Sequence, residues 1–373
     1  MNRKTIRVLH VVYAMNLGGI ESWLMHLYRE VVKDGIQFDF LVNIQAEGAY
    51  DVEINKLGGQ IIFGQHYKHP IKQYFHLKNK FKRRANYSAI HIHNIESASI
   101  VHLALKNKSD TNIIIQSHND FYKEMRFISA IGKIWLVFNK FYVNFFVKNK
   151  IAVSSISGES MFWKNKYNII PIGESFQSYE KKIKTLKKED FNLTETDIVI
   201  SHVGRFFEPK NHLFLLQIIL GLKKRQTHSF KCLLIGEGPT QKDCIKFVAK
   251  HNLTEDVLFL NSRTDVPEIL TQVTDLFIFP SLYEGLGLAV VEAQAAGLPI
   301  ICSNTIPNEA IIIPELVNKI DLLKNEEFWV SEIISHFEKF KNYSKPAALK
   351  KVIKSDLNIQ VGIKQYIALW TKK

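Results

Sequence analysis

The stretch DLFIFPSLYEGLGLAVVEAQAAG, residues 275–297, decides the fold of this chain of 373 residues. It begins with an apolar run that is typical of a buried strand in a parallel sheet. It ends with apolar and small residues that predict a helix, and Gly285 and Gly287 stand where this helix begins. Because glycine lets the backbone approach a ligand closely, this strand, loop and helix predict a ligand site within an α/β fold.

The start of this helix favours an anion. Its first amides have no partner within the helix and the helix dipole adds positive character, which suits a phosphate. Two carboxylates bracket the loop, Glu284 before it and Glu292 within the helix. A carboxylate accepts hydrogen bonds from hydroxyl groups rather than binding phosphate, so the pattern indicates sugars on either side of a phosphate.

Predicted strands and helices alternate along the whole chain, which favours an α/β architecture with parallel sheets. The length suits two domains: residues 1–175, a charged linker at 176–190, residues 191–350, and a C-terminal helix at 351–373. The expected strands are residues 7–15, 38–42, 60–64, 89–94, 112–118 and 150–155, followed by 197–205, 231–238, 257–262, 275–281 and 299–304.

Composition narrows the class of protein. Three scattered cysteines show no metal-ligand spacing, which favours a reducing compartment without disulfides. Arg7 and His10 interrupt the apolar start, so we expect a first strand rather than a signal peptide, and no run is long enough to span a membrane. The net charge is +13, and residues 1–175 carry 23 Lys and Arg against 13 Asp and Glu. This basic half indicates an anionic partner (a membrane, a phosphorylated lipid or nucleic acid) or serves solubility alone.

Two stretches, 71–84 and 121–150, combine aromatic and basic residues. In the second, Lys133, Lys140 and Lys148 share one predicted helical face with Asn144. Such a helix suits a bilayer interface, with its aromatic side chains inward and its lysines at the headgroups. The alternative is a helix packed on the sheet with a solvated basic stripe.

Two other loops are candidates for phosphate chemistry. Arg205 stands at the end of the predicted strand at 197–205 and Lys210 in the loop after it, and two fixed cations can neutralise a diphosphate leaving group without a metal. Alone, they would equally be two surface cations. Gly18 and Gly19 lie between the first strand and a helix, although glycine pairs often serve only the geometry of a turn.

Histidines stand near the ends of two predicted strands. His91 and His93 face the same side of a strand, but no carboxylate or cysteine accompanies them at metal-ligand spacing. His118 closes the strand at 112–118. No D-x-D motif follows a strand, and the dinucleotide, P-loop, zinc and hydrolase patterns are absent. We therefore expect no metal and no cofactor, and without a recognised binding module we expect no nucleic acid.

Together these residues resemble the family 4 glycosyltransferases, which are retaining enzymes of the GT-B fold, and the resemblance covers nearly the whole chain. The run at 259–270 looks like the family's nucleobase-contacting segment, near Arg263. PIGES at 171–175 and Asn261 depart from the family pattern, so the resemblance does not define the hinge or the base pocket. The matching motif residues are Glu284, Glu292, Arg205, Lys210, Gly18, Gly19 and His118.

The resemblance implies two Rossmann-like domains facing each other across a cleft, the first for the acceptor and the second for a nucleotide-sugar, with the last helix crossing back to the first. It implies that Glu292 binds the ribose, Glu284 the sugar hydroxyls and His118 the sugar. Arg205 and Lys210 would stabilise the departing diphosphate. Amides of Leu286, Gly287 and Leu288, after Gly285, would hold the distal phosphate or the sugar.

The expected function is thus metal-independent, retaining transfer from a UDP-sugar to a saccharide or polyprenyl-diphosphate-linked acceptor in capsule or exopolysaccharide biosynthesis. We expect a cytoplasmic protein with peripheral contact to an anionic membrane through its first domain. Two rivals stay open: a nucleotide-sugar epimerase of the same fold, which needs no acceptor, and a non-catalytic subunit that binds the nucleotide-sugar but never transfers it.

Overall fold

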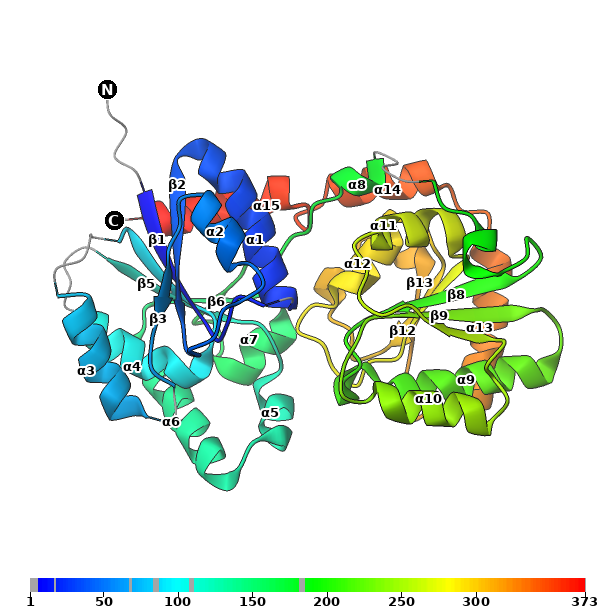
Figure 1. Ribbon diagram of the computed structural model, residues 1–373, viewed down its shortest axis with the longest axis horizontal. Coiled ribbons are helices and arrows are strands. Elements are labelled where there is room, and N and C mark those ends of the chain that lie inside the picture. The colour runs from blue at the N-terminus through cyan, green and yellow to red at the C-terminus, as the bar shows by residue number, and fades with distance from the viewer. Residues whose placement is uncertain are drawn as a thin grey trace. The chain divides into compact units, whose positions relative to one another are not determined.

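The computed structural model describes residues 6–16, 18–66, 69–82, 87–106, 111–180 and 185–372. The chain divides into two units, Met1–Glu174 with Ile359–Lys373, and Ser175–Asn358 (Figure 1). Each unit is a parallel sheet with helices on both faces, so the predicted α/β class is confirmed. All strands expected from the sequence are present.

The first sheet has the order β3-β2-β1-β4-β5-β6-β7, and neighbouring strands are parallel throughout. Its strands are β1 (Ile6–Val12), β2 (Ile36–Val42), β3 (Ile61–Phe63), β4 (Ala89–Ile92), β5 (Asn112–Ser117), β6 (Asn149–Ala152) and β7 (Asn168–Ile169). The helices of this unit are α1 (Gly19–Val31), α2 (Asp51–Lys56), α3 (Pro70–Lys80), α4 (Ile95–Leu105), α5 (Phe121–Glu124), α6 (Ala130–Phe146), α7 (Ser155–Met161) and α15 (Ile359–Thr371).

The second sheet repeats this arrangement, with the order β10-β9-β8-β11-β12-β13. Its strands are β8 (Ile198–Val203), β9 (Phe230–Ile235), β10 (Val257–Phe259), β11 (Leu276–Phe279), β12 (Ile300–Ser303) and β13 (Val317–Ile320). The helices are α8 (Gln177–Glu180), α9 (His212–Arg225), α10 (Gln241–Lys250), α11 (Val266–Glu268), α12 (Leu288–Ala295), α13 (Glu326–Phe340) and α14 (Lys345–Ile353).

Both sheets reverse their strand order at one point, between β1 and β4 in the first and between β8 and β11 in the second. In open parallel sheets, ligands bind at the carboxyl ends of the strands beside such a point. The edge strands β7 and β13 were not predicted, because each is short and mostly outside the core, so neither has the apolar run of a central strand.

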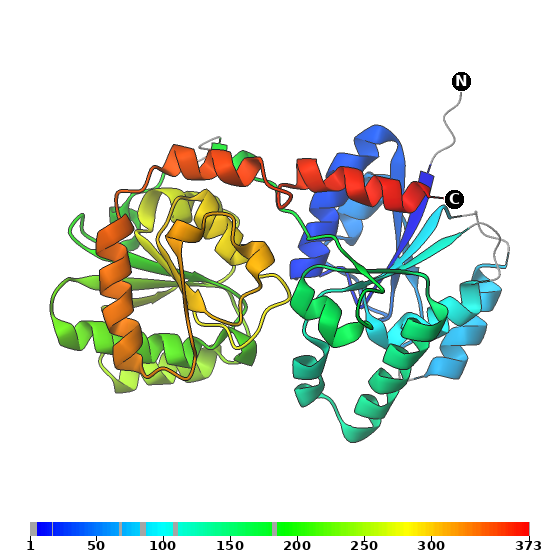
Figure 2. The ribbon, with the colours of Figure 1, turned by 180° about the vertical axis from the view of Figure 1, so that it is seen from behind.

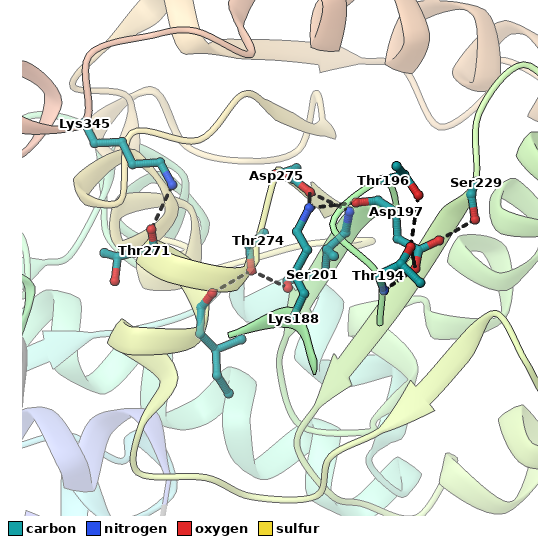
Figure 3. Close-up of polar contacts among 12 residues, drawn as sticks. Lys188, Thr194, Thr196, Asp197, Ser201, Ser229, Thr271, Thr274, Asp275 and Lys345 are labelled. Atoms are coloured by element: carbon teal, nitrogen blue, oxygen red, sulfur yellow. Dashed lines mark hydrogen bonds and ion pairs between the residues drawn. The ribbon is translucent and has the colours of Figure 1, made fainter. Parts of the chain in front are cut away.

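A polar network fastens the opposite, amino end of the second sheet (Figure 3). Lys188 Nζ donates to Asp275 Oδ2 (2.9 Å) and to the carbonyl oxygen of Asp197 (2.7 Å). Asp275 Oδ2 also accepts from the amide of Val199 (2.8 Å), and a hydrogen bond joins Ser201 Oγ to Thr274 Oγ1 (2.7 Å). These contacts tie the start of β8 to the start of β11.

The stretch expected as a linker, 176–190, contributes structure to the second unit. It contains α8, and Leu186 is buried in a cluster with Phe191 and Leu233. Residues 181–184 lie outside the described residues.

The chain then returns to the first unit with α15, the red helix that ends at C in Figure 2, and α15 packs against α1. Gln116 Nε2 donates to Tyr366 Oη (2.9 Å), and Trp370 is fully buried. These contacts make α15 part of the core of the first unit.

Part of the polar stripe on α6, which the sequence left as either membrane-facing or solvated, is engaged inside the first unit. Asn144 is buried, and its Nδ2 donates to the carbonyl oxygens of Lys140 and Met161. Lys140 is half-buried and donates to the carbonyl oxygen of Ser160 (2.5 Å) and to Tyr122 Oη (2.7 Å). The alternative of a solvated basic stripe therefore holds only in part: Lys148 is exposed, whereas Asn144 and Lys140 donate to backbone carbonyls beside the helix. Of the other aromatic and basic stretch, residues 83 and 84 lie outside the described residues.

Candidate functional site

Three loops meet at the carboxyl end of the second sheet, after β8, β9 and β11. The amide of Leu282 donates to the carbonyl oxygen of Pro209 (2.7 Å), and Asn211 Nδ2 donates to that of Pro280 (3.1 Å). These bonds hold the loop after β8, which carries Arg205 and Lys210, against the loop after β11. The predicted basic and acidic motifs are thereby brought together at the point of strand reversal.

Lys210 and Glu284 form an ion pair within this site. Lys210 Nζ donates to Glu284 Oε1 at 2.7 Å, and the two side chains are 24% and 12% exposed. The ammonium also lies 4.9 Å from the ring centroid of Phe279. Arg205, in the same loop, is exposed, with its guanidinium 6.0 Å from the ring of Phe207. The pair holds Lys210 in place, and Arg205 stays in solvent.

The predicted helix start is α12, and Gly287 is its N-cap. Gly287 has φ +89°, in the left-handed region where a side chain is strained, which explains a glycine here. Gly285 and Leu286 are buried in the loop, Leu288 is the first helical residue, and Glu292 is half-buried one turn later. The first amides of an α-helix have no intrahelical acceptor, so the helix start beside Lys210 favours an anion.

Two glycines missed by the motif analysis hold the loops after β8 and β9 together. Gly236 has φ +137°, and a Cβ there would lie 2.2 Å from the carbonyl oxygen of Gly204. A Cβ at Gly238 would lie 2.2 Å from the carbonyl oxygen of Phe206. In the sequence these residues look like an ordinary glycine turn. The carbonyl oxygens that come close to them belong to Gly204 and Phe206, which are distant along the chain, so no local pattern shows the need for glycine.

Two buried histidines, His202 and His212, pack beneath the loop that carries Arg205 and Lys210. The Nδ1–H of His202 donates to the carbonyl oxygen of Ile278 (2.9 Å), and His212 stacks on Phe206 with ring centroids 4.0 Å apart. Burial lowers the pKa of His202 to about 4 and that of His212 to about 2. Both rings are therefore neutral near pH 7, so the cations here come from Lys210 and Arg205. The pattern ISHVGRFFEPKNH shows both histidines but not their burial.

Arg263 lies in the loop after β10. Its guanidinium donates to both carboxylate oxygens of Asp265 (2.7 Å each) and lies 5.6 Å from the ring of Phe191. Nearby, the amide of Gly236 donates to the carbonyl oxygen of Asn261 (2.8 Å). The side chain of Arg263 is thus engaged with an internal partner.

The first unit has its own pocket, of about 270 Å³, at the corresponding point of its sheet. Residues after β1, β4 and β5 line it, among them Tyr13, His93 and His118. Gly18 and Gly19 lie between Tyr13 and Ile20, which also lines the pocket. Gly18 is the N-cap of α1, and a Cβ at Gly19 would meet open space, so the backbone there is accessible.

A chain of histidines lies behind this pocket. One hydrogen bond joins His118 Nε2 to His93 Nδ1, and a second joins His93 Nε2 to His10 Nδ1, both at 2.9 Å. Burial lowers the pKa of His10 and of His118 to about 3, and lowers that of His93 strongly, so all three are neutral near pH 7. The sequence suggested a pair, His91 with His93, but could not show that β1 places His10 beside them.

The group His10, His91 and His93 has ligand atoms within 4.8 Å of one another, which raises the question of a metal. Trp370 Nε1 donates to His91 Nδ1 at 3.3 Å. An indole N–H can only donate, so the proton of neutral His91 must sit on Nε2, and neither nitrogen then offers a lone pair. These residues therefore do not fit a three-histidine metal site.

Comparisons with known proteins agree with this architecture. The family model described as Glycosyltransferase Family 4 matches residues 17–160, and that described as Glycosyl transferases group 1 matches residues 183–327. The protein named glycosyltransferase EpsF from Bacillus subtilis is 31% identical over 89% of this chain and 88% of its own. The capsular polysaccharide biosynthesis glycosyltransferase CapH of Staphylococcus aureus is 24% identical over 82% of this chain and 83% of its own.

A third relative matches a smaller part of the chain. It is the UDP-Gal:alpha-D-GlcNAc-diphosphoundecaprenol alpha-1,3-galactosyltransferase of Escherichia coli, 30% identical over 39% of each chain. Among solved structures, Anabaena HepE in complex with UDP and glucose has a TM-score of 0.78 at 15% identity and covers 99% of this chain and 100% of its own. The two units, each built on a parallel sheet, thus have the GT-B fold of sugar-transferring enzymes. The chain belongs to glycosyltransferase family 4.

Proposed function

We propose that this glycosyltransferase moves a sugar from a UDP-sugar to a saccharide or polyprenyl-diphosphate-linked acceptor, with retention of anomeric configuration and without a metal. The observation that carries the proposal is the Lys210–Glu284 pair beside the start of α12. A cation and the first amides of a helix suit a diphosphate, and a carboxylate suits sugar hydroxyls. The relative HepE, solved with UDP and glucose, supports a UDP-sugar as donor.

Each site residue has an assigned role. Lys210 and Arg205 stabilise the diphosphate as the bond from the sugar to phosphate breaks, while Glu284 binds the sugar hydroxyls and Glu292 the ribose. The amides of Leu286, Gly287 and Leu288 hold the distal phosphate or the sugar. The departing phosphate accepts the proton of the acceptor hydroxyl, so no protein nucleophile is required. Cations fixed before the reaction do not have to reorganise during it, which favours a large contribution to the rate.

The first unit receives the acceptor in this proposal, at the pocket that His118 lines, and His118 contacts the transferred sugar. The Gly19 backbone beside this pocket is open to a ligand, and Gly18 precedes it at the start of α1. The backbone near Arg263 contacts the base in this proposal. The names of CapH and of the Escherichia coli relative support a polysaccharide or lipid-linked acceptor. We place the reaction in cell-surface polysaccharide biosynthesis, on the cytoplasmic side of a membrane. Among the described residues no helix is both long and apolar enough to cross a bilayer.

A panel of nucleotide-sugars tests the donor, because ligands that bind the native state raise its apparent stability. We expect a UDP-sugar to give the largest rise in melting temperature. NMR of the product formed from that donor should show the same anomeric configuration as the donor, with turnover unchanged by EDTA. An inverted product, or turnover abolished by EDTA and restored by a divalent ion, would contradict this mechanism.

The two rivals give different results in the same assay. An epimerase would convert the donor without any acceptor, and a non-catalytic subunit would bind the donor without converting it. A Lys210→Ala variant that still binds UDP but no longer transfers sugar would support the assignment made here.

A further inference from the structure

The most unusual surface of the first unit is one face of α6. Five large apolar side chains recur at intervals of three and four residues, so they share one side of the helix. Ile131 is 83% exposed, Ile134 71% and Phe145 67%. The opposite side, with Leu136 and Val143, is buried in the core of the unit. We call the exposed face the α6 stripe; it consists of Ile131, Ile134, Phe138, Phe141 and Phe145.

The α6 stripe continues onto the next loop and is bordered by positive charge. The ring of Trp163 meets that of Phe145 edge-on, with centroids 4.6 Å apart, and Trp163 is itself partly exposed. Lys164 and Lys166, next in the chain, are exposed, as is Lys148 just after the helix. Within 121–150, Arg126 is also exposed and Lys123 and Lys133 are partly exposed, whereas Lys150 is buried. The apolar face therefore lies within a basic surface.

An apolar face within a basic surface distinguishes between two possible partners of the α6 stripe, a second copy of the chain and a lipid bilayer. A second copy of the chain would bury apolar surface, but it would also bring two basic surfaces together, which is unfavourable. An anionic bilayer accepts the aromatic and aliphatic side chains at the depth of the headgroups, and its phosphates attract the surrounding lysines. Charge complementarity thus favours the bilayer.

We propose that the α6 stripe, with Trp163, inserts into the interface of an anionic membrane while Lys148, Lys164 and Lys166 contact its headgroups. The proposal deepens the proposed function, since a polyprenyl-linked acceptor lies at such a surface. Its physical basis is nevertheless separate, because no residue of the stripe belongs to the donor site. Insertion predicts that apolar and basic side chains both contribute, and that only the basic contribution is screened by salt.

Flotation with vesicles tests the proposal on the full chain, using phosphatidylcholine alone and phosphatidylcholine with phosphatidylglycerol. We expect binding to the anionic vesicles at low salt and little to the neutral ones. Replacing both Phe138 and Phe141 by serine should weaken binding roughly tenfold or more, because each large apolar side chain contributes when it leaves water. Lys148→Gln with Lys166→Gln should weaken binding at low salt and have less effect at high salt.

A matched control is Leu323→Ser with Ile245→Ser, two exposed apolar residues of the second unit, which should leave binding unchanged. Lys210→Ala should also bind normally, so failure of the catalytic proposal is distinguishable from failure of this one. The proposal is overturned if the wild-type protein ignores anionic vesicles at low salt, or if the serine pair binds as the wild type does. It is equally overturned if the stripe supports a dimer in analytical ultracentrifugation that the serine pair dissolves and that does not bind vesicles.

Discussion

The two units share one strand order, and each has a pocket or a cluster of loops where that order reverses. The side chains at this point differ: they are charged in the second unit and mainly neutral in the first. In the second unit, loops after β8 and β11 bring a lysine and a carboxylate to 2.7 Å beside a helix start. In the first, loops after β1, β4 and β5 present neutral histidines around a pocket. Topology therefore sets where the two candidate sites lie, and the side chains set their character: an ion pair beside a helix start in the second unit, and neutral histidines in the first.

The largest expected effect comes from removing charge at the second site. Lys210→Ala and Glu284→Ala should each lower kcat by about 100- to 1,000-fold, the usual cost of losing one group that stabilises developing charge. Circular dichroism should show normal folding in both. Lys223→Ala is the matched control, because Lys223 is also ion-paired, with Asp256 at 2.8 Å, but away from the site. Turnover close to wild type in both variants would remove the assignment.

Acid should act on the neutral histidines of the first unit. Burial lowers the pKa of His10 and of His118 from the ordinary 6.5 to about 3. Because the folded pKa lies below the unfolded one, the unfolded state binds more protons between them. The stabilisation present above about pH 6.5 is then lost as the pH falls toward 3, by about 1.4 kcal/mol per pH unit for each histidine.

Urea unfolding at several pH values from neutral to mildly acidic measures this loss. His118→Gln should show a shallower fall in the free energy of unfolding than the wild type, and His228→Gln, at an exposed position, should not. Equal slopes for all three proteins would show that burial of these histidines does not govern acid stability.

Two glycines, Gly236 in the second unit and Gly19 in the first, allow a further comparison between the units. Gly236→Ala should reduce the free energy of unfolding by roughly 1–3 kcal/mol, because its φ is +137° and the new Cβ meets the carbonyl oxygen of Gly204. Gly19→Ala meets open space and should change stability by less than about 0.5 kcal/mol. If the backbone at Gly19 approaches a ligand, its variant should nevertheless lose turnover. A Gly236→Ala protein as stable as the wild type would mean that the two loops separate without cost.

Among the substitutions expected to destabilise the protein, the smallest effect comes from the hydrogen bond of Trp370. Trp370→Phe removes the indole N–H that donates to His91 and should cost about 1 kcal/mol beyond the change in volume. Trp23→Phe is a matched control, since Trp23 is equally buried but its Nε1 has no hydrogen-bond partner among the residues that the structure describes. Nitrogen NMR should show His91 losing its single tautomer only in the Trp370 variant. An unchanged tautomer would reopen the question of a metal at this group.

Most of the fold was predictable because central strands are continuous apolar runs, whereas edge strands such as β7 and β13 are not. In the second unit, much of the candidate site was also visible in the sequence. Glu284, Gly287 and Glu292 lie within one short segment, so local spacing reports their arrangement.

Other features depend on residues that are distant along the chain. The need for glycine at position 236 comes from a carbonyl at position 204, and the tautomer of His91 comes from Trp370 near the C-terminus. The sequence left the exposed face of α6 undecided for the same reason. Helical spacing groups Lys133, Lys140 and Asn144 correctly, but only packing decides that Asn144 is buried and that Phe138 and Phe141 face outward.

By itself the sequence determined two α/β units with parallel sheets. It also determined the glycine loop that begins α12 and the charged side chains near this loop, because each of these features is encoded by neighbouring residues. The tertiary structure alone decided that Lys210 pairs with Glu284, that His10 joins His93 and His118, and that α6 exposes its apolar side. Strand pairing and loop contacts bring together residues that are far apart in the chain, and no local pattern records which pairs those will be.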